Sequence, residues 1–380
     1  MSLSHLAPPL SATVNAAEWA ERLVILHRQL YASEEVDFDE VMTHVYAPPK
    51  GWWLADHCLV HDGTDWHLYY VTGPFEYADE WIANLRAKRY AECRKTPYEM
   101  GDAHAAGPAL NQLECRGLIM QEPQAEFGTL LQGTSNIARF EDHWVNVYTT
   151  RGPEGEALAL ARSRDLHEWE YEPANPIWRP PDYARSGGSC KNAHIVRPPA
   201  DGRYLIYYCV SLNDGTCAVG LLSTQDFAGF ADHGPVFKTS KQMRGTAGTE
   251  SPTVVCRNGM WHLFVAFGPG YWHAVSPRPD DFLGRAGLDM EDFWSASGAV
   301  RGSYFFGRFH CMELFEHAGQ WWMTSTRKEY QRYLNRRAGI LKYRGSAADE
   351  ASLLPGLFLA RVEWEGDRPI PVRVEPERIP

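Results

Sequence analysis

The stretch Asn258-Gly-Met-Trp261-His-Leu-Phe-Val265 places an Asn-Gly pair directly before a short segment rich in aromatic and apolar residues. Four other segments repeat this phrase, each after an apolar stretch and a turn: 62–70, 141–148, 201–208 and 318–325. A strand, a tight turn with Gly or Asp and a second strand form a β-hairpin signal. The aromatic anchors of the five segments lie 78, 60, 57 and 60 residues apart: Trp66, Trp144, Tyr204, Trp261 and Trp321. The chain therefore repeats one hairpin unit five times.

A second repeat lies downstream of the hairpins and supplies further strands. Segments 158–169 and 219–227 each run from a strand to Ser, Asp and an apolar residue, and looser copies surround Asp102 and His273. Five units of about four strands, at a period near 60 residues, predict an all-β fold, a five-bladed β-propeller. The alternative is a pair of β-sandwiches with unrelated aromatic hairpins, which five evenly spaced copies disfavour.

Two segments carry helical periodicity. Residues 15–33 begin with a capping box at 15–18 and keep apolar residues on one face, so we expect a short N-terminal helix outside the propeller. We expect a second helix at 78–93, as an insertion in blade 1. No low-complexity linker divides the chain, which predicts a helical extension over 1–45 and a single propeller domain over 46–380.

Composition excludes several classes of protein. The 380 residues carry Lys+Arg 37 against Asp+Glu 48, a net charge of -11, and nucleic acid or an acidic membrane needs a basic surface. The mean hydropathy is -0.40, and no long apolar run or basic leader is visible, which predicts a cytoplasmic protein that binds no membrane. Eight cysteines without a CxxC pair predict reduced thiols. The oligomeric state stays open.

The candidate site follows from the geometry of a propeller, in which the first strand of each blade lines a central funnel. Counting back 9 to 12 positions from each anchor gives the residues where these strands start: Asp56, Thr134 or Ser135, Asn192, Glu250 and His310. Acids from blades 1 and 4 then face each other across one cavity. Cleavage of a glycosidic bond needs two such carboxylates, one to protonate the leaving oxygen and one to activate water or attack carbon.

At these residues the chain resembles the five-bladed propeller glycoside hydrolases, the arabinofuranosidase and xylosidase family (family 43) and the related invertase and fructanase family (family 32). Trp53-Leu-Ala-Asp56 resembles the blade 1 motif that carries their base or nucleophile, and Glu250-Ser-Pro252 resembles the Glu-x-Pro motif of their general acid. The resemblance covers roughly residues 45 to 345. It implies that Asp56 and Glu250 are catalytic and that no cofactor is required. It also implies an axial position for His310, near a water or a calcium ion.

One position departs from the pattern of these families. They place a third aspartate in blade 3, where this sequence has Lys191-Asn192-Ala193. An asparagine can hydrogen-bond a sugar hydroxyl, but it supplies no negative charge to raise the pKa of Glu250. Lys191 would lower that pKa and would suit an anionic substrate group or phosphate.

The remaining candidates are side chains near the strand starts. The predicted substrate contacts are Lys191, Asn192, His194, Trp53, Ser135, His310 and Trp272. His194 alternates to the face of Asn192, although packing between blades explains it equally well. The candidates for a stacking platform are Trp52, Trp53, Tyr271 and Trp272, whereas most tryptophans must belong to the core. For Arg327-Lys328 the favoured interpretation is a solvated strand end, with binding of a carboxylate or phosphate as the alternative.

Two functions stay open at this point. The first is hydrolysis of a short oligosaccharide or glycoside by Asp56 and Glu250, inverting or retaining according to the separation of the two carboxylates. The second, favoured by Asn192, is a sugar-binding propeller that is catalytically silent or has altered chemistry such as phosphorolysis. In both cases the expected partner is a small oligosaccharide or glycoside.

Overall fold

The computed structural model describes ten stretches of the chain, residues 38–77, 101–120, 131–152, 154–179, 181–197, 202–238, 249–267, 270–282, 309–327 and 355–380, with single residues at 80, 83, 84, 87, 89, 92 and 95. The helix predicted at 15–33 lies outside the described residues, as does most of the helix predicted at 78–93. In the second segment, Ala87 N donates to Ala83 O (3.1 Å), which is a helical hydrogen bond. Within the described ranges, no helix has the length and apolar character to cross a membrane.

The described strands form five antiparallel sheets, so the predicted five-bladed propeller is confirmed. Blade 1 contains β2 (His57–His61), β3 (Trp66–Thr72), β4 (Gly101–Gly107) and β5 (Glu114–Leu118). Blade 2 contains β6 (Leu131–Phe140), β7 (His143–Gly152), β8 (Gly155–Ser163) and β9 (Glu170–Tyr171). Blade 3 contains β10 (Cys190–Val196), β11 (Tyr204–Ser211), β12 (Cys217–Thr224) and β13 (Ala231–Lys238). In its described part, blade 4 contains β14 (Glu250–Arg257), β15 (Met260–Phe267) and β16 (Gly270–Ser276).

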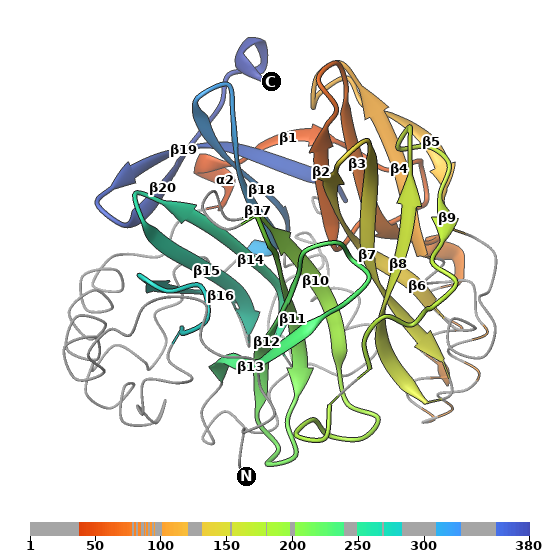
Figure 1. The fold of residues 1–380 in the computed structure, drawn as a ribbon. Helices are drawn as coiled ribbons and strands as arrows, with labels where there is room; N and C mark the ends of the chain where they lie inside the picture. The colour runs from red at the N-terminus through yellow and green to blue at the C-terminus, as the bar shows by residue number, and fades with distance from the viewer. Residues whose placement is uncertain are drawn as a thin grey trace.

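Blade 5 closes the ring with a strand from the other end of the sequence. It contains β17 (Phe309–His317), β18 (Gln320–Arg327) and β19 (Leu357–Glu365), and the edge of β19 pairs with β1 (Thr43–Tyr46) and with β20 (Arg368–Val372). Figure 1 shows β1 lying beside β19. The first strands β2, β6, β10, β14 and β17 contact one another in this order, and β17 returns to β2. The propeller therefore includes residues that precede position 46.

The short helices lie at the edges of this ring. They are α2 (Phe38–Val41), which directly precedes β1, η1 (Phe75–Tyr77) after β3 and η4 (Pro376–Arg378) near the C-terminus. Phe38 of α2 is fully buried and stacks edge-on against Phe309 and Phe358 of blade 5. The entry to β1 is thus anchored in the core between blades.

All five predicted hairpins are present as the first two strands of a blade. Two of them have two-residue loops in which both residues have positive φ, Asn258-Gly259 (51° and 77°) and Ala318-Gly319 (51° and 74°). Positive φ at both positions is the type I′ geometry that matches the twist of paired strands. The aromatic residues of the second strands are mainly core: the fully buried side chains include Tyr69, Tyr70, Tyr148, Tyr207 and Tyr208.

The downstream Ser and Asp repeat forms the turn after the third strand of blades 2 and 3. Ser163 Oγ accepts Leu166 N (2.9 Å), and Asp165 Oδ1 accepts His167 N and Glu168 N (both 2.9 Å). In blade 3 the equivalent hydroxyl belongs to Thr224, not to Ser223, because Thr224 Oγ1 accepts Phe227 N (2.9 Å). These turns explain the motif as local backbone capping.

The first strands of blades 2 to 5 each contain a β-bulge near their start, where the pairing register shifts. In each bulge a residue other than glycine has positive φ, namely Thr134 (56°), Asn192 (56°), Ser251 (46°) and Cys311 (50°). A bulge re-aims the side chain it carries, and such a backbone is kept only where the surroundings fix it. Asp56 directly precedes β2 at the corresponding place in blade 1. We call Asp56, Thr134, Asn192, Ser251 and Cys311 the floor residues.

A belt of hydrogen bonds links the blades just below the floor residues. The belt residues, one per blade, are Cys58, Asn136, His194, Thr253 and Glu313. The bonds are Ile137 N to Cys58 Sγ (3.4 Å), Ile195 N to Asn136 Oδ1 (2.7 Å), His194 Nε2 to Val254 O (3.1 Å), Thr253 Oγ1 to Met312 O (2.6 Å) and Leu59 N to Glu313 Oε2 (3.0 Å). Each junction between neighbouring blades has one of these bonds.

Candidate active site

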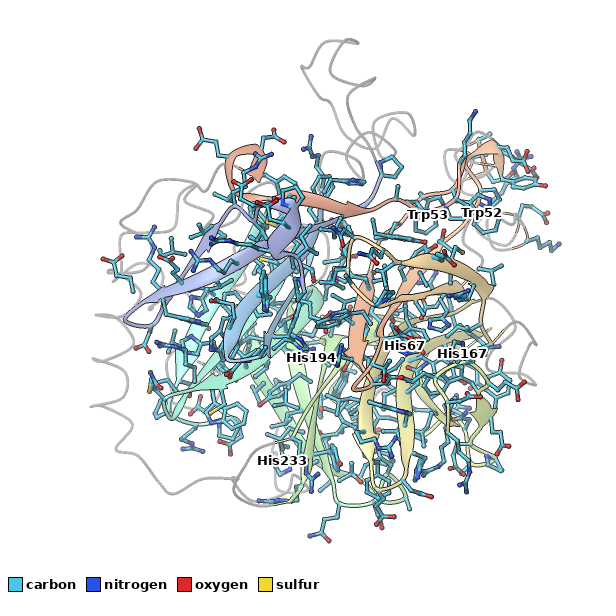
Figure 2. The ribbon with its side chains drawn as sticks, turned by 90° about the horizontal axis from the view of Figure 1, so that it is seen from above. Trp52, Trp53, His67, His167, His194 and His233 are labelled. Carbon is cyan, nitrogen blue, oxygen red and sulfur yellow. The ribbon has the colours of Figure 1, made fainter. Side chains whose placement is uncertain are left out.

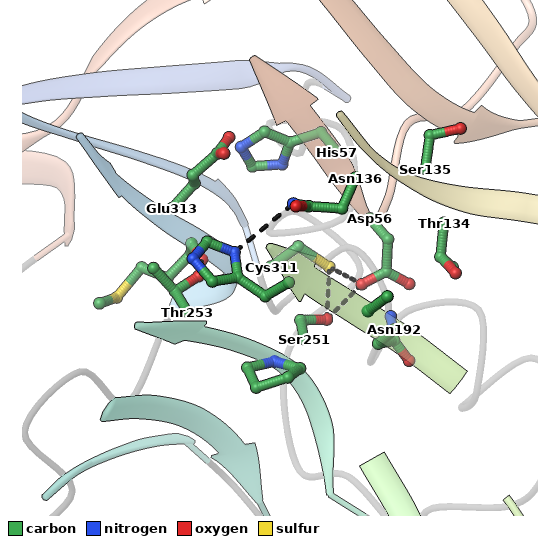
Figure 3. A pocket seen from close by; sticks show the side chains of 14 residues that line it. Asp56, His57, Thr134, Ser135, Asn136, Asn192, Ser251, Thr253, Cys311 and Glu313 are labelled. Atoms are coloured by element: carbon green, nitrogen blue, oxygen red, sulfur yellow. Dashed lines mark hydrogen bonds between the residues drawn. The ribbon is translucent and has the colours of Figure 1, made fainter. Parts of the chain in front are cut away.

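The floor residues lie around a small cavity at the propeller axis. Its lining comprises Asp56, His57, Thr134 to Asn136, Asn192 to His194, Ser251 to Thr253 and Cys311 to Glu313. Figure 3 shows these side chains converging from all five blades. The cavity measures about 30 Å³. Because one water needs about 10–15 Å³ on this measure, this space has room for about two or three waters.

Asp56 is held by two donors from other blades. Ser251 Oγ and Cys311 Sγ both donate to Asp56 Oδ1, the thiol at 3.0 Å. Ser251 comes from blade 4 and Cys311 from blade 5, 195 and 255 residues away in sequence. Asp56 as a whole residue is partly exposed, and it lines the cavity.

Glu250 directly precedes Ser251 and forms an ion pair. Lys191 Nζ donates to Glu250 Oε1 (2.9 Å), and His310 Nε2 lies 3.8 Å from Glu250 Oε2. Burial alone would raise the pKa of Glu250, but Lys191 and His310 outweigh it and hold the pKa well below its usual range. Burial would lower the pKa of Lys191, but Glu250, with smaller contributions from Glu156 and Asp56, raises it instead.

Asn192 occupies the floor position of blade 3, where the sequence predicts a sugar contact. Its backbone N donates to Thr149 Oγ1 (3.0 Å), while its side-chain Oδ1 is buried without a hydrogen-bond partner in the described part of the chain. An unpaired buried acceptor costs about 1–3 kcal/mol, which a donor from a ligand or water would relieve. Asn192 thus has an acceptor to offer at the floor.

Thr134 and Ser135 are held from blade 1. Their backbone N atoms donate to Asp102 Oδ1 (3.1 Å) and Oδ2 (2.8 Å). Burial raises the pKa of Asp102 to about 6, although these donors lower it. Ser135 Oγ accepts Asn146 Nδ2 (2.8 Å). Ser135 therefore lines the cavity with its hydroxyl already in use as an acceptor.

Two other predicted substrate contacts, His194 and Trp53, are packed inside the protein. His194 lines the cavity but belongs to the belt, and burial lowers its pKa to about 4. Trp53 is 5% exposed and is not among the cavity-lining residues. Figure 2 shows Trp52 and Trp53 far from His194. Trp53 is thus buried outside the cavity lining, and Nε2 of His194 is already engaged by Val254 O.

In blades 4 and 5, Tyr271 and Arg327 are engaged in contacts within the protein. Tyr271 is fully buried, and its hydroxyl donates to Ser251 O (3.3 Å) and accepts Met312 N (2.7 Å). The side chain of Trp272 and all of Lys328 lie outside the described residues. Arg327 pairs with Asp39 and covers the Phe38 ring, so it anchors α2. The guanidinium of Arg327 is thus already paired with a carboxylate of the chain itself, and binding of an anion from outside stays a prediction.

A larger groove of about 470 Å³ adjoins the site between blades 2 and 3. It is lined by Gly152, Glu154 to Ala157, Arg179, Pro181, Asp182, Ala184, Ser186, Gly187 and Asn213. The end of β7 pairs with the start of β6 (Leu131 with Arg151), so the groove opens on the face that carries the floor residues. Glu156 connects the groove to the site, since its Oε2 accepts the N of Cys190, the neighbour of Lys191 (3.2 Å). A groove of this size fits a small ligand.

Counting back from the hairpin anchors missed Ser251, Cys311, Glu156 and Asp102. Ser251 and Cys311 directly follow the predicted strand starts Glu250 and His310. Counting one residue fewer back from the aromatic anchors of blades 4 and 5 would have found them. Within the described part of the chain, no group of three His, Cys, Asp or Glu side chains is arranged to hold a metal.

The chain matches no protein-family model, and no curated protein is similar to it in sequence. Solved structures are similar along nearly its whole length. Fructan 1-exohydrolase IIa from Cichorium intybus superposes with a TM-score of 0.60 at 16% identity, over 90% of this chain and 62% of that chain. The chain has the fold of the five-bladed propeller glycoside hydrolases.

Two further solved structures with this fold are also similar to the chain. A family 32 β-fructofuranosidase of Bombyx mori has a TM-score of 0.55 at 14% identity, over 94% of this chain and 70% of that chain. A thermostable family 43 glycoside hydrolase has a TM-score of 0.55 at 16% identity, over 88% and 97%. Propeller glycoside hydrolases of both families named from the sequence are thus structural neighbours of this chain.

Proposed function

We propose that this protein is a glycoside hydrolase that cleaves a short oligosaccharide or glycoside, with Asp56 and Glu250 as its carboxylate pair. The observation that carries the proposal is the hydrogen bond from Ser251 to Asp56, because it brings the blade 1 acid next to the residue that follows Glu250. Glu250 donates a proton to the leaving oxygen, and Asp56 attacks the anomeric carbon or activates water. Two neighbours were solved with sucrose and with 1-kestose, which supports a small saccharide as substrate.

The ion pair with Lys191 sets a condition on this mechanism. A general acid must carry a proton, but Lys191 keeps Glu250 ionised. Glu250 becomes a donor when the substrate enters from the groove side and separates it from Lys191, since burial then raises its pKa. The hydrolase therefore works best at acidic pH.

The same ion pair favours a second candidate, a sugar-binding propeller without hydrolysis. Phosphorolysis fits the described charges less well. Lys191 is surrounded by the carboxylates of Glu250, Glu156 and Asp56, so a phosphate would enter a site already rich in negative charge.

A panel of sucrose, 1-kestose and aryl glycosides tests both candidates, with and without inorganic phosphate, between pH 4 and 8. Wild type is compared with Asp56→Asn, Glu250→Gln and the control Cys256→Ala, which lies at the far end of β14. We expect phosphate-independent turnover that falls about 10²- to 10⁴-fold in the two carboxylate variants and stays unchanged in the control. Binding without turnover establishes the second candidate, and full activity in both carboxylate variants refutes the assignment.

A further inference from the structure

Two side chains of the floor converge on one oxygen of Asp56 from two other blades. Ser251 and Cys311 both donate to Oδ1, and they also approach each other, Oγ to Sγ, at 3.7 Å. Figure 3 shows the second oxygen of Asp56 on the side of Thr134, away from these two donors. A carboxylate oxygen accepts hydrogen bonds from hydroxyl and thiol groups, so both contacts act on the same atom, Oδ1.

The backbone at both donors is bent to make these contacts. Ser251 and Cys311 have φ of 46° and 50°, in a region that residues other than glycine adopt at a cost of about 1–3 kcal/mol. One tyrosine hydroxyl holds both bends. Tyr271 Oη donates to Ser251 O (3.3 Å) and accepts Met312 N (2.7 Å), the residue after Cys311. One fully buried side chain thus contacts the backbone at both bends.

Cys311 also connects the two acids. Its Sγ lies 2.7 Å from His310 Nδ1 and 3.0 Å from Asp56 Oδ1, and His310 Nε2 lies 3.8 Å from Glu250 Oε2. Burial, together with Asp56, raises the pKa of Cys311, so the sulfur keeps its proton and donates it. A thiolate at this place would repel Asp56.

We propose that Ser251 and Cys311 are positioning residues that fix Asp56 Oδ1, so that Oδ2 is aimed at the bound glycoside. This role rests on the hydrolase function proposed above. Loss of both donors frees the carboxylate to rotate, and a misplacement of about 1 Å at a reacting group lowers the rate about 100-fold. Because substrate binding uses other groups, such as Asn192, the effect falls on kcat and leaves KM within about threefold.

The test compares Ser251→Ala, Cys311→Ala, their double variant and Cys311→Ser, with Cys256→Ala as the matched cysteine control. Crystal structures of wild type and the double variant report the Asp56 orientation without any substrate. We expect a rotated Asp56 carboxylate and a kcat about 100-fold lower in the double variant, with Cys311→Ser recovering most of the activity because a hydroxyl restores the donor.

If Ser251 and Cys311 served stability alone, the double variant would unfold at a lower temperature while its Asp56 carboxylate kept the wild-type orientation. Any residue of similar size at position 311 would then restore the wild-type behaviour. An unmoved Asp56 carboxylate in the double variant, or a kcat within twofold of wild type, overturns the proposal. If wild type cleaves no glycoside, the hydrolase proposal fails, while the crystal structures still decide whether the two residues position Asp56.

Discussion

At the scale of single residues, Lys191 controls the charge state of the candidate acid. It donates to Glu250 at 2.9 Å, with its side chain 20% exposed and that of Glu250 31% exposed, so solvent screens the pair only in part. The pair lowers the pKa of Glu250 and raises that of Lys191. At neutral pH nearly all Glu250 is therefore ionised, and acid catalysis is lost as the pH rises.

Replacement Lys191→Met tests this control. Without the ammonium, the pKa of Glu250 rises, and each unit increases the protonated fraction at pH 7 about tenfold. For a general acid, we expect kcat/KM at pH 7 to rise about tenfold or more and the basic limb of the pH profile of kcat/KM to move to higher pH, because this profile reports the pKa of Glu250 in the free enzyme, where Lys191 is still paired with it. The control Lys238→Met removes an exposed ion pair with Asp214 and leaves the profile unchanged. A lower kcat/KM with an unmoved basic limb would mean that Lys191 binds the substrate.

At the scale of elements, the join between α2, β1 and blade 5 holds the propeller closed. The strand β1 has only four residues and pairs with β19 alone among the described strands, so its own ladder is weak. Phe38, in the helix before it, packs on Phe309 and Phe358, with ring centroids 4.8 and 5.0 Å away, and Arg327 covers its face. Side-chain packing rather than strand length therefore anchors this segment.

The variant Phe38→Ala measures that anchor. Removing a fully buried aromatic ring leaves a cavity, and we expect a loss of about 3–5 kcal/mol in the free energy of unfolding, measured by urea denaturation. Glu40→Ala, on the exposed face of the same helix, is the control and changes stability by less than about 0.5 kcal/mol. A loss below about 1 kcal/mol for Phe38→Ala would show that α2 does not support the closure.

The hairpins were predictable because their signals are local. A turn pair with positive φ and flanking apolar segments fixes each hairpin within about 15 residues, as at Asn258-Gly259. The bulges were not predictable in this way. Positive φ at Thr134, Asn192, Ser251 and Cys311 has no glycine signal in the sequence, because contacts with neighbouring blades impose it.

At the scale of the whole molecule, the belt joins all five blades around the axis. Its bond between blades 5 and 1 is made by Glu313, a buried carboxyl that accepts Leu59 N at 3.0 Å. Burial raises the pKa of Glu313 to about 8, and the hydrogen bond from Leu59 N opposes this rise. Glu313 is thus largely protonated in the folded protein at neutral pH, while the unfolded chain has already lost this proton.

This difference predicts a pH dependence of stability. Between the usual value of 4.5 and about 8, the folded state binds one proton more than the unfolded state, so Glu313 makes the free energy of unfolding fall as pH rises. We expect Glu313→Gln to remove this slope and to be more stable than wild type near pH 8, by chemical denaturation at each pH. Glu316→Gln, exposed on the same strand, keeps the wild-type slope. Parallel pH profiles for Glu313→Gln and wild type would contradict the prediction.

The sequence by itself determined the five-fold period, the hairpins and the residues at the start of each first strand, because these depend on neighbours in the chain and on the alternation of strands. It also indicated that Lys191 would lower the pKa of Glu250, since Lys191 directly precedes Asn192, the residue expected at the funnel in blade 3. Only the tertiary structure decided which groups meet at the axis. Asp56 meets Ser251 and Cys311 across 195 and 255 residues, and β1 pairs with β19, because closing the sheets into a ring brings distant segments together.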